Sequence, residues 1–251
     1  MVHFVGAGCG APDLITLRGA RLLSEADVVI YAGSLVNPAL LQNVKPSCRV
    51  YDSARMTLEE VLAVMEQAEA EGLTTVRLHT GDPSLYGAVR EQYDALERRG
   101  IAFDVCPGVS AFSGAAASLR TEYTLPGVSQ TLVITRAAGR TAVPEREQIR
   151  ALAAHGASMA FYLSAALAGE LQRELEEGGC PPDCPAAVVY KATWPEEKIL
   201  HCPVSRLAET MESSGIRKTA LVLVGRFLEA EGERSCLYAP DFATEFREAK
   251  P

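Results

Sequence analysis

Short apolar runs alternate with amphipathic stretches along the first half of the chain. The apolar runs are of strand length and lie at residues 2–6, 26–31, 75–79 and 101–106. Helix patterns fill the intervals, and we expect them near residues 13–24, 38–43, 57–71, 83–99 and 110–119. One of these begins with Thr57-Leu58-Glu59-Glu60, which has the form of a capping box. Strands interleaved with helices predict a parallel sheet with crossover connections.

The regular alternation of strand and helix patterns ends at Thr124-Leu125-Pro126-Gly127. Strand patterns follow at 129–135, 159–163, 186–190, 197–201 and 219–227, with helix patterns at 144–154, 165–177 and 203–213. Two successive strands with no helix between them favour a mixed sheet. We therefore predict an α/β fold of two domains, residues 1–120 and residues 121–251, each of ordinary small-domain size.

Small-residue loops follow three of the strands in the first half. They read Gly6-Ala7-Gly8-Cys9-Gly10-Ala11-Pro12, Thr80-Gly81-Asp82-Pro83 and Pro107-Gly108-Val109-Ser110. The loops that leave the carboxyl ends of parallel strands share one edge of the sheet, and ligands bind along that edge. The pattern predicts a cleft that is lined largely by backbone.

Two of these loops also have simpler interpretations. Asp82 followed by Pro83 is typical of a helix start, with Asp as N-cap and Pro at the first helical position. The first loop aligns with a dinucleotide-binding fingerprint, or it is a tight turn that needs glycine. The fingerprint requires an acidic residue at the end of the second strand, where this chain has Ala32-Gly33. A nicotinamide or flavin site is therefore disfavoured.

Charge and composition exclude several classes of protein. The chain has 251 residues, 48% of them hydrophobic, and a net charge of −8, which argues against bulk nucleic-acid binding. We find neither a signal-peptide pattern nor an apolar run of membrane-spanning length, so we expect a soluble, cytoplasmic protein. The seven cysteines are expected to be reduced, and no metal site is predicted, because Cys180-Pro-Pro-Asp-Cys184 lacks a matching ligand pair. The four histidines show no ligand spacing and read as core or surface residues.

Candidate charged groups occur in the second half. Arg136 and Arg140 lie in a Gly-containing loop after a strand and suit the recognition of carboxylates, although for any single arginine a solvated loop is the more common case. Lys191 and Ala192 leave another strand of the same domain and are expected to face the same cleft. No Ser-His-Asp arrangement or paired carboxylate stands out, so the catalytic residues stay unknown.

Taken together, the loops resemble those of the tetrapyrrole methylase family, which uses S-adenosylmethionine to methylate uroporphyrinogen and precorrins. The resemblance rests on Gly6-Ala7-Gly8 with Pro12-Asp13-Leu14-Ile15-Thr16, on the other two loops above, and extends to the strand at 219–225. Tyr31-Ala32-Gly33-Ser34-Leu35-Val36-Asn37, Ser84-Leu85-Tyr86-Gly87 and Ile134–Thr141 look most like the branch that acts at C11 of precorrin-4 or cobalt-precorrin-4 in cobalamin synthesis.

The resemblance implies two α/β domains with the cofactor in a cleft between them, and a homodimer. It implies S-adenosylmethionine contacts, with S-adenosylhomocysteine as product, at Pro12, Gly81, Asp82, Leu85, Ser110, Ala111, Leu163, Ala192 and Ala220. For the anionic tetrapyrrole we predict Arg136 and Arg140, then Arg120 and Lys191.

Two departures from the family pattern bear on which reaction of the family this chain is expected to catalyse. The first loop usually reads Gly-Pro-Gly-Asp-Pro, whereas here Cys9 and Ala11 replace a proline and a carboxylate. Uroporphyrinogen enzymes carry an Asp after the tyrosine of the second strand, where this chain has Ala32. The alternatives that remain open are a precorrin methylase acting at another ring carbon, a nicotinamide-dependent oxidoreductase, and a cofactor-binding protein without turnover.

Overall fold

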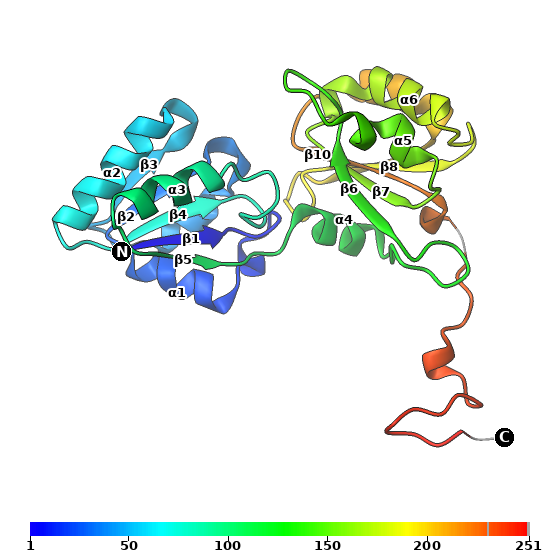
Figure 1. Cartoon of the computed structure of the whole chain (residues 1–251), viewed down its shortest axis with the longest axis horizontal. Helices are drawn as coiled ribbons and strands as arrows, with labels where there is room; N and C mark the ends of the chain where they lie inside the picture. Colours follow the sequence, from blue (N-terminus) through cyan, green and yellow to red (C-terminus); the bar gives the residue numbers. More distant parts are fainter. Residues whose placement is uncertain (230, 250–251) are drawn as a thin grey trace. The chain divides into compact units, whose positions relative to one another are not determined.

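The computed structural model describes residues 1–229 and 231–249 and divides the chain into two compact units (Figure 1). Unit 1 consists of Met1–Ser118 and Lys191–Glu197, and unit 2 of Leu119–Tyr190 and Lys198–Pro251. The predicted domain boundary at residue 120 differs from this division mainly in one segment. Lys191–Glu197 follows a strand of unit 2 along the chain but packs with unit 1.

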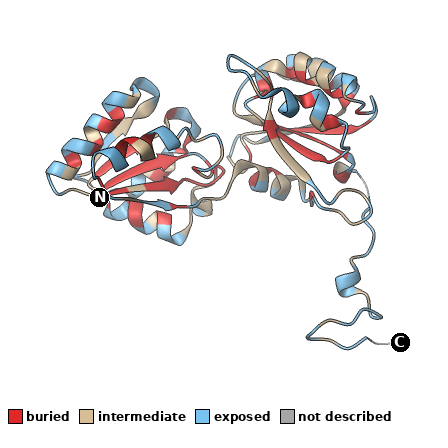
Figure 2. Ribbon diagram, in the orientation of Figure 1, coloured by how far each residue is buried: buried red, intermediate tan, exposed pale blue. Residues whose placement is uncertain are grey.

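Unit 1 contains a five-stranded sheet in which every pairing is parallel. The strand order is β3-β2-β4-β1-β5, with β1 Val2–Gly6, β2 Val28–Tyr31, β3 Arg49–Asp52, β4 Thr75–His79 and β5 Phe103–Cys106. The predicted parallel sheet is confirmed. Its central strands are buried on both faces, which explains why they read as continuous apolar runs (Figure 2).

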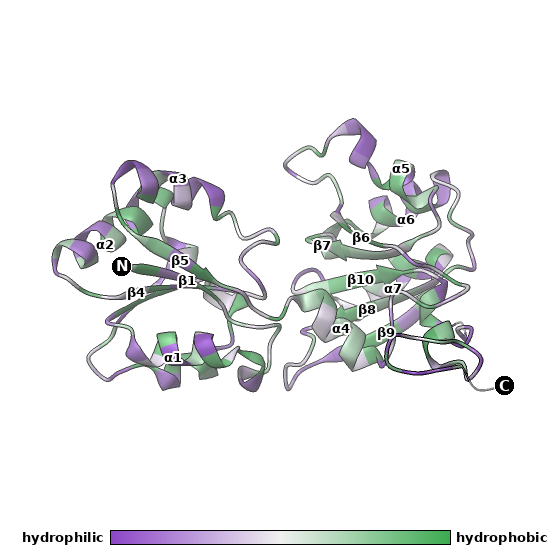
Figure 3. Ribbon diagram, turned by 60° about the horizontal axis from the view of Figure 1, so that its bottom comes forward, coloured by the Kyte–Doolittle hydropathy of each residue, from purple (hydrophilic) through white to green (hydrophobic). Residues whose placement is uncertain are grey.

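Helices cover both faces of this sheet. They are α1 Leu17–Glu25, α2 Leu58–Ala70 and α3 Arg90–Arg98, and a further helix, α4 Ala111–Leu119, follows β5 without packing in the core of this sheet. α1 lies on one face and α2 and α3 lie on the other, with their polar sides turned outward (Figure 3). Thr57 and Glu60 form the predicted capping box at the start of α2.

The helix predicted at 83–99 is shorter than expected, because α3 begins only at Arg90. The segment before it turns tightly: Tyr86 and Ala88 have φ of 55° and 48°, and a Cβ on Gly87 would lie 2.3 Å from the carbonyl oxygen of Pro83. These backbone conformations are incompatible with a helix. The prediction that Asp82 and Pro83 start the helix is therefore wrong.

Unit 2 contains a mixed five-stranded sheet, as predicted. The order is β6-β7-β10-β8-β9, with β6 Leu132–Arg136, β7 Ser158–Tyr162, β8 Pro185–Tyr190, β9 Lys198–Pro203 and β10 Ala220–Val224. β6 and β7 are parallel, and the other pairings are antiparallel. The helices are α5 Ile149–Ala153, α6 Ala168–Glu177 and α7 Leu207–Ser214.

A single core joins these helices to the sheet of unit 2. It includes the fully buried Phe161, Leu171, Leu175 and Val222. The helix predicted at 144–154 is split into a 3-10 turn at Glu145–Glu147 and α5, because Gln148 between them has an extended backbone (ψ 143°). All seven cysteines are free thiols. Among the described residues, no helix has both the length and the apolar character needed to cross a membrane.

Candidate functional site

The first two predicted loops of unit 1 are hydrogen-bonded to each other through their backbones. They leave the neighbouring strands β1 and β4, whose register pairs Gly6 with His79. Beyond the strand ends, Ala7 N donates to His79 O at 2.7 Å, and Gly81 N donates to Gly8 O at 2.9 Å. The two loops therefore leave the sheet as one connected surface, as the sequence analysis anticipated.

Three glycines allow the loops to approach this closely. A Cβ on Gly108 would lie 2.2 Å from Gly81 O and 2.8 Å from Gly6 Cα, and a Cβ on Gly6 would lie 2.6 Å from Gly108 Cα. No side chain larger than hydrogen fits at Gly6 or Gly108 without moving backbone. At Gly81 the requirement is conformational, because φ is +61° while the nearest atom to its Cβ position is 3.6 Å away.

The Asp82 carboxylate joins the second and third loops. Its Oδ1 accepts from Ser84 N at 2.8 Å and from Ser84 Oγ at 2.5 Å, and its Oδ2 accepts from Gly108 N at 2.8 Å. Burial acts to raise the pKa of Asp82, but the hydrogen bonds from Ser84 and Gly108 outweigh it, so the pKa lies below its usual value. Asp82 is therefore ionised at neutral pH and fixes the geometry of both loops.

A row of buried polar side chains leads along β4 to these loops. Thr75, Arg77 and His79 lie on one face of the strand and are 1%, 7% and 4% exposed. Arg77 donates from Nε to Gln92 Oε1 at 3.2 Å and from Nη1 to Ile30 O at 3.1 Å. Burial first, and then the charge of Arg77, lowers the pKa of His79 to about 3, and its Nε2 has no hydrogen-bond partner. His79 is thus a neutral core histidine, one of the two interpretations that the sequence left open.

The Lys191–Glu197 segment, which we call the strap, packs against the first loop within unit 1. Thr193 Oγ1 accepts from Ala11 N at 2.9 Å and lies 3.6 Å from Cys9 Sγ. The indole of Trp194 occupies the space beside Gly10, since a Cβ there would lie 2.2 Å from Trp194 Cδ1. On the other side of this loop, Asn37 Nδ2 donates to Gly10 O at 2.9 Å. The strap places Ala192 next to a loop that carries Pro12.

Seven of the nine predicted cofactor residues lie in unit 1. Pro12 begins a 3-10 turn, Gly81, Asp82 and Leu85 lie in the second loop, Ser110 and Ala111 lie at the start of α4, and Ala192 lies in the strap. Leu163 and Ala220 belong to unit 2. The sequence did not single out Asn37, Thr193, Trp194 or Glu197 as site residues. Asn37 ends a segment that resembles the family, but nothing in that segment indicates its contact with Gly10, and the other three residues belong to no motif.

One end of the sheet in unit 2 gathers several of the remaining predicted residues. Arg136 ends β6 and pairs with Tyr162, the last residue of β7, so Leu163 follows at the same end. Ala220 begins β10 and pairs with Tyr190, which directly precedes Lys191. The strand register therefore brings Arg136, Leu163, Ala220 and the start of the strap to one sheet edge.

Backbone strain occurs at this edge and in the strap. Seven non-glycine residues in the described chain have a positive φ; Leu163 and Thr219 lie at this edge of unit 2, and Lys191 and Thr193 lie in the strap of unit 1. Strained residues of this kind cluster at ligand-binding sites, because the surrounding structure has to hold them in place. Leu163 is also 68% exposed despite its apolar side chain. These features single out the edge as a candidate binding surface.

The predicted tetrapyrrole-binding cations differ in their surroundings. The Arg136 guanidinium donates to the carbonyl oxygens of Ala137, Thr141 and Ala142 at 3.0–3.1 Å and so shapes the loop in which the exposed Arg140 lies. Lys191 Nζ lies 3.6 Å from Glu196 Oε2 and 4.8 Å from the centre of the Trp194 ring. Arg120 is exposed, with a φ of 54°.

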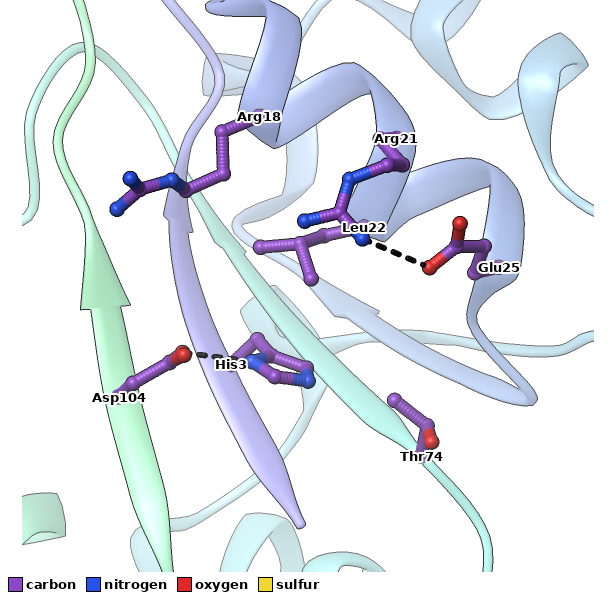
Figure 4. Close-up of a pocket in the computed structure, with 7 residues that line it drawn as sticks. All are labelled: His3, Arg18, Arg21, Leu22, Glu25, Thr74 and Asp104. Atoms are coloured by element: carbon purple, nitrogen blue, oxygen red, sulfur yellow. Dashed lines mark hydrogen bonds and ion pairs between the residues drawn. The ribbon is translucent and has the colours of Figure 1, made fainter.

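A groove of about 440 Å³ lies elsewhere on unit 1 (Figure 4). It is lined by His3, Thr74 and Asp104, which lie near the amino ends of their strands, and by Arg18, Arg21, Leu22 and Glu25 of α1. Four of these side chains contact one another in pairs: His3 Nδ1 lies 2.6 Å from Asp104 Oδ1, and Arg21 lies 3.4 Å from Glu25. No predicted cofactor or substrate residue lines this groove, which is at the wrong end of the strands for the loops.

Comparison with known proteins identifies the family and the fold. The family model for tetrapyrrole (corrin/porphyrin) methylases matches residues 1–208. The chain belongs to the tetrapyrrole methylase family. A cobalt-precorrin-4 C(11)-methyltransferase of Methanocaldococcus jannaschii is 48% identical over 99% of this chain and 96% of its own length. A precorrin-4 C(11)-methyltransferase of Rhodococcus erythropolis is 47% identical over 92% and 93%.

Solved structures of family members have the same architecture. The X-ray structure of a cobalt precorrin-4 methyltransferase superimposes with a TM-score of 0.89, at 44% identity over 91% of this chain and 96% of the other. A uroporphyrin-III C-methyltransferase of Thermus thermophilus, complexed with S-adenosylhomocysteine, gives 0.77 at 27% identity over 90% and 98%. The two-domain α/β fold that the resemblance implied is therefore shown.

The departure from the family's first loop has a structural counterpart here. Cys9 and Ala11, which replace the usual proline and aspartate, both contact Thr193 of the strap. Burial raises the pKa of the Cys9 thiol, so Cys9 is a neutral packing residue in this loop.

Proposed function

We propose that this chain is an S-adenosylmethionine-dependent methyltransferase that methylates C11 of precorrin-4 or cobalt-precorrin-4 in cobalamin biosynthesis. The observation that carries the proposal is its 42–48% identity, over nearly its full length, to relatives named for that reaction. The uroporphyrin-III methyltransferase of known structure is more distant, at 27% identity. Ala32, where uroporphyrinogen enzymes carry an Asp, agrees with this choice.

For the cofactor we propose the nine positions named from the loops: Pro12, Gly81, Asp82, Leu85, Ser110, Ala111, Leu163, Ala192 and Ala220. Two observations support a fit. Gly6, Gly81 and Gly108 let three loops pack together through their backbones at the carboxyl ends of β1, β4 and β5, the end of a parallel sheet where ligands bind. Strained backbone also occurs at Leu163 itself and directly beside Ala192 and Ala220. Backbone N–H and C=O groups are well suited to hold the polar groups of such a ligand.

The mechanism that follows depends on positioning. S-adenosylmethionine supplies a methyl group that its sulfonium has already activated for attack by a nucleophilic carbon. The loops of unit 1 orient the donor, and arginine and lysine side chains orient the anionic macrocycle. Correct orientation is able to supply roughly 7–11 kcal/mol of the barrier reduction. This agrees with a site that shows no catalytic pair of side chains, and we assign no general base.

For the carboxylates of the macrocycle we propose Arg136, Arg140, Arg120 and Lys191. The exposed Arg140 is free to form bidentate hydrogen bonds, while Arg136 holds the loop around it through three carbonyl oxygens. We also propose, from the resemblance alone, a homodimer in the cytoplasm; light scattering of the purified protein would measure its mass.

Arg140→Ala is expected to weaken tetrapyrrole binding about tenfold, since it removes one charge-assisted contact, and to leave S-adenosylhomocysteine affinity unchanged. Arg136→Ala should weaken tetrapyrrole binding at least as much, because the loop also loses its three internal hydrogen bonds. Fluorescence titration with the tetrapyrrole measures both. Arg173→Ala, an exposed change on α6, serves as the control. Unchanged tetrapyrrole affinity in both variants would remove these residues from the site.

Asp82→Ala is expected to weaken S-adenosylhomocysteine binding about tenfold, because the second and third loops lose the carboxylate that joins them. Calorimetric titration measures the change. Asp94→Ala is a matched control, because it removes a carboxylate from an exposed ion pair with Arg90 on α3. Equal affinities for the Asp82→Ala variant and the wild type would show that the carboxylate does not organise the site.

The reaction itself is tested by mass spectrometry of the product. The protein is incubated with a precorrin-4 or cobalt-precorrin-4 pool and a methyl donor labelled with ¹³C. We expect one labelled methyl group per macrocycle, located at C11 by NMR. A label at another ring carbon would reassign the protein within the family, and a preference for one pool would decide whether the substrate already carries cobalt.

A further inference from the structure

We infer that Glu197 is a positioning residue for the cofactor site, acting through the strap. The inference rests on the proposed function, because the strap carries Ala192, one of the proposed cofactor contacts. Glu197 belongs to no sequence motif. Its role is argued from the hydrogen bonds around it within unit 1.

The Glu197 carboxylate joins the strap to α4. Its Oε2 accepts from Thr193 N at 2.6 Å and from Ser118 Oγ at 2.6 Å. α4 begins at Ala111, directly after Ser110, and both of these residues are proposed cofactor contacts. One carboxylate oxygen therefore links the helix that starts at one part of the site to the segment that carries another.

The strap needs this support because its backbone is strained. Lys191 and Thr193, the residues on either side of Ala192, have φ of 48° and 67°. Non-glycine residues adopt such conformations only where surrounding contacts hold them. The hydrogen bond to Thr193 N acts on one of the two strained residues directly. Without it, Thr193 is free to relax to a negative φ, and the backbone of the adjoining Ala192 moves with it.

Thr193 also transmits the effect to the first loop. Once its backbone is held by Glu197, its Oγ1 accepts from Ala11 N at 2.9 Å, next to Pro12. Gly114 of α4 lies on the opposite side of this contact, since a Cβ there would be 2.6 Å from Cys9 Sγ and 3.4 Å from Thr193 Cγ2. The first loop, the strap and α4 therefore pack together here, and the Glu197 carboxylate connects the strap to α4.

Glu197→Ala, Glu197→Gln and Ser118→Ala test the inference, with Glu196→Gln as control. Glu196 is the preceding carboxylate, with a side chain 60% exposed, and it pairs with Lys191 and not with Thr193 or Ser118. We expect S-adenosylhomocysteine to bind the Glu197→Ala variant at least about tenfold more weakly than wild type. Glu197→Gln keeps one neutral acceptor, and Ser118→Ala removes only one donor. The affinity of each of these variants should therefore lie between that of wild type and that of Glu197→Ala. Glu196→Gln should bind as wild type does.

Kinetics and fluorescence separate positioning from general destabilisation. In the Glu197→Ala variant, KM for the methyl donor should rise about tenfold while kcat at saturating donor stays within about twofold of wild type. Emission of Trp194, the single tryptophan, should shift to the red as the strap leaves Gly10. Thermal unfolding of each variant confirms that it is folded.

The outcomes distinguish this inference from the proposed function. If wild type binds S-adenosylhomocysteine but Glu197→Ala binds it equally well, or if Glu196→Gln loses as much affinity, Glu197 is not a positioning residue and the proposed function stands. If wild-type protein has no affinity for S-adenosylhomocysteine, the proposed function fails and the inference fails with it.

Discussion

Gly108→Ala is expected to weaken S-adenosylhomocysteine binding by about 100-fold or more. The new Cβ would lie 2.2 Å from Gly81 O and 2.8 Å from Gly6 Cα, so backbone has to move by about 1 Å to restore ordinary contact. Any such movement displaces the second loop and strains the hydrogen bond from Gly108 N to Asp82 Oδ2. Calorimetric titration of the folded variant measures the loss.

Gly169→Ala is the matched control for this glycine substitution. Gly169 lies in α6, has a negative φ, and a Cβ there meets no atom within 4 Å. This substitution should leave cofactor affinity unchanged and stabilise the helix by up to about 1 kcal/mol. If Gly108→Ala binds S-adenosylhomocysteine as wild type does, the meeting point of the three loops does not form the cofactor site.

The parallel sheet of unit 1 and the loops at its edge were predictable because each depends on local information. Apolar runs of strand length, separated by helix patterns, require crossovers and a parallel sheet, and Gly6, Gly81 and Gly108 mark the strand ends. The capping box at Thr57 was predictable for the same reason, since its two hydrogen bonds span only three residues. The family's fold then followed from the resemblance.

Contacts between residues distant in sequence were not predictable. Asp82 has the pattern of an N-cap, but its carboxylate accepts from Gly108 N, which is 26 residues away, and the helix begins only at Arg90. The strap is a clearer case. Thr193 and Ala11 are 182 residues apart, and nothing local distinguishes Thr193 from any other residue in a turn. Arg136 reads as a ligand-binding group, yet its guanidinium is engaged by carbonyls of its own loop.

The stability of unit 1 is expected to fall by about 2 kcal/mol between pH 6.5 and pH 5 because of His79. Burial and the neighbouring Arg77 lower the pKa of His79 to about 3 in the folded protein, whereas the unfolded chain protonates it near pH 6.5. Below pH 6.5 the unfolded state therefore binds a proton that the folded state does not. Stability is lost as the pH falls from 6.5 toward 3 and changes no further from this cause below that.

Urea unfolding at a series of pH values, followed by the fluorescence of Trp194, isolates this effect because the single tryptophan belongs to unit 1. His79→Gln removes the titrating group, so its stability should be nearly independent of pH between 6.5 and 5. His201→Gln, at an exposed position on β9, should keep the wild-type dependence. Protonation of Asp82 does not contribute between pH 6.5 and pH 5. Because the pKa of Asp82 is lowered, its protonation reduces the stability of the protein only below about pH 4. If the unfolding free energy of wild type and of His79→Gln depended on pH equally, the prediction would be wrong. His79 would then be protonated beside Arg77 in the folded protein without a measurable loss of stability.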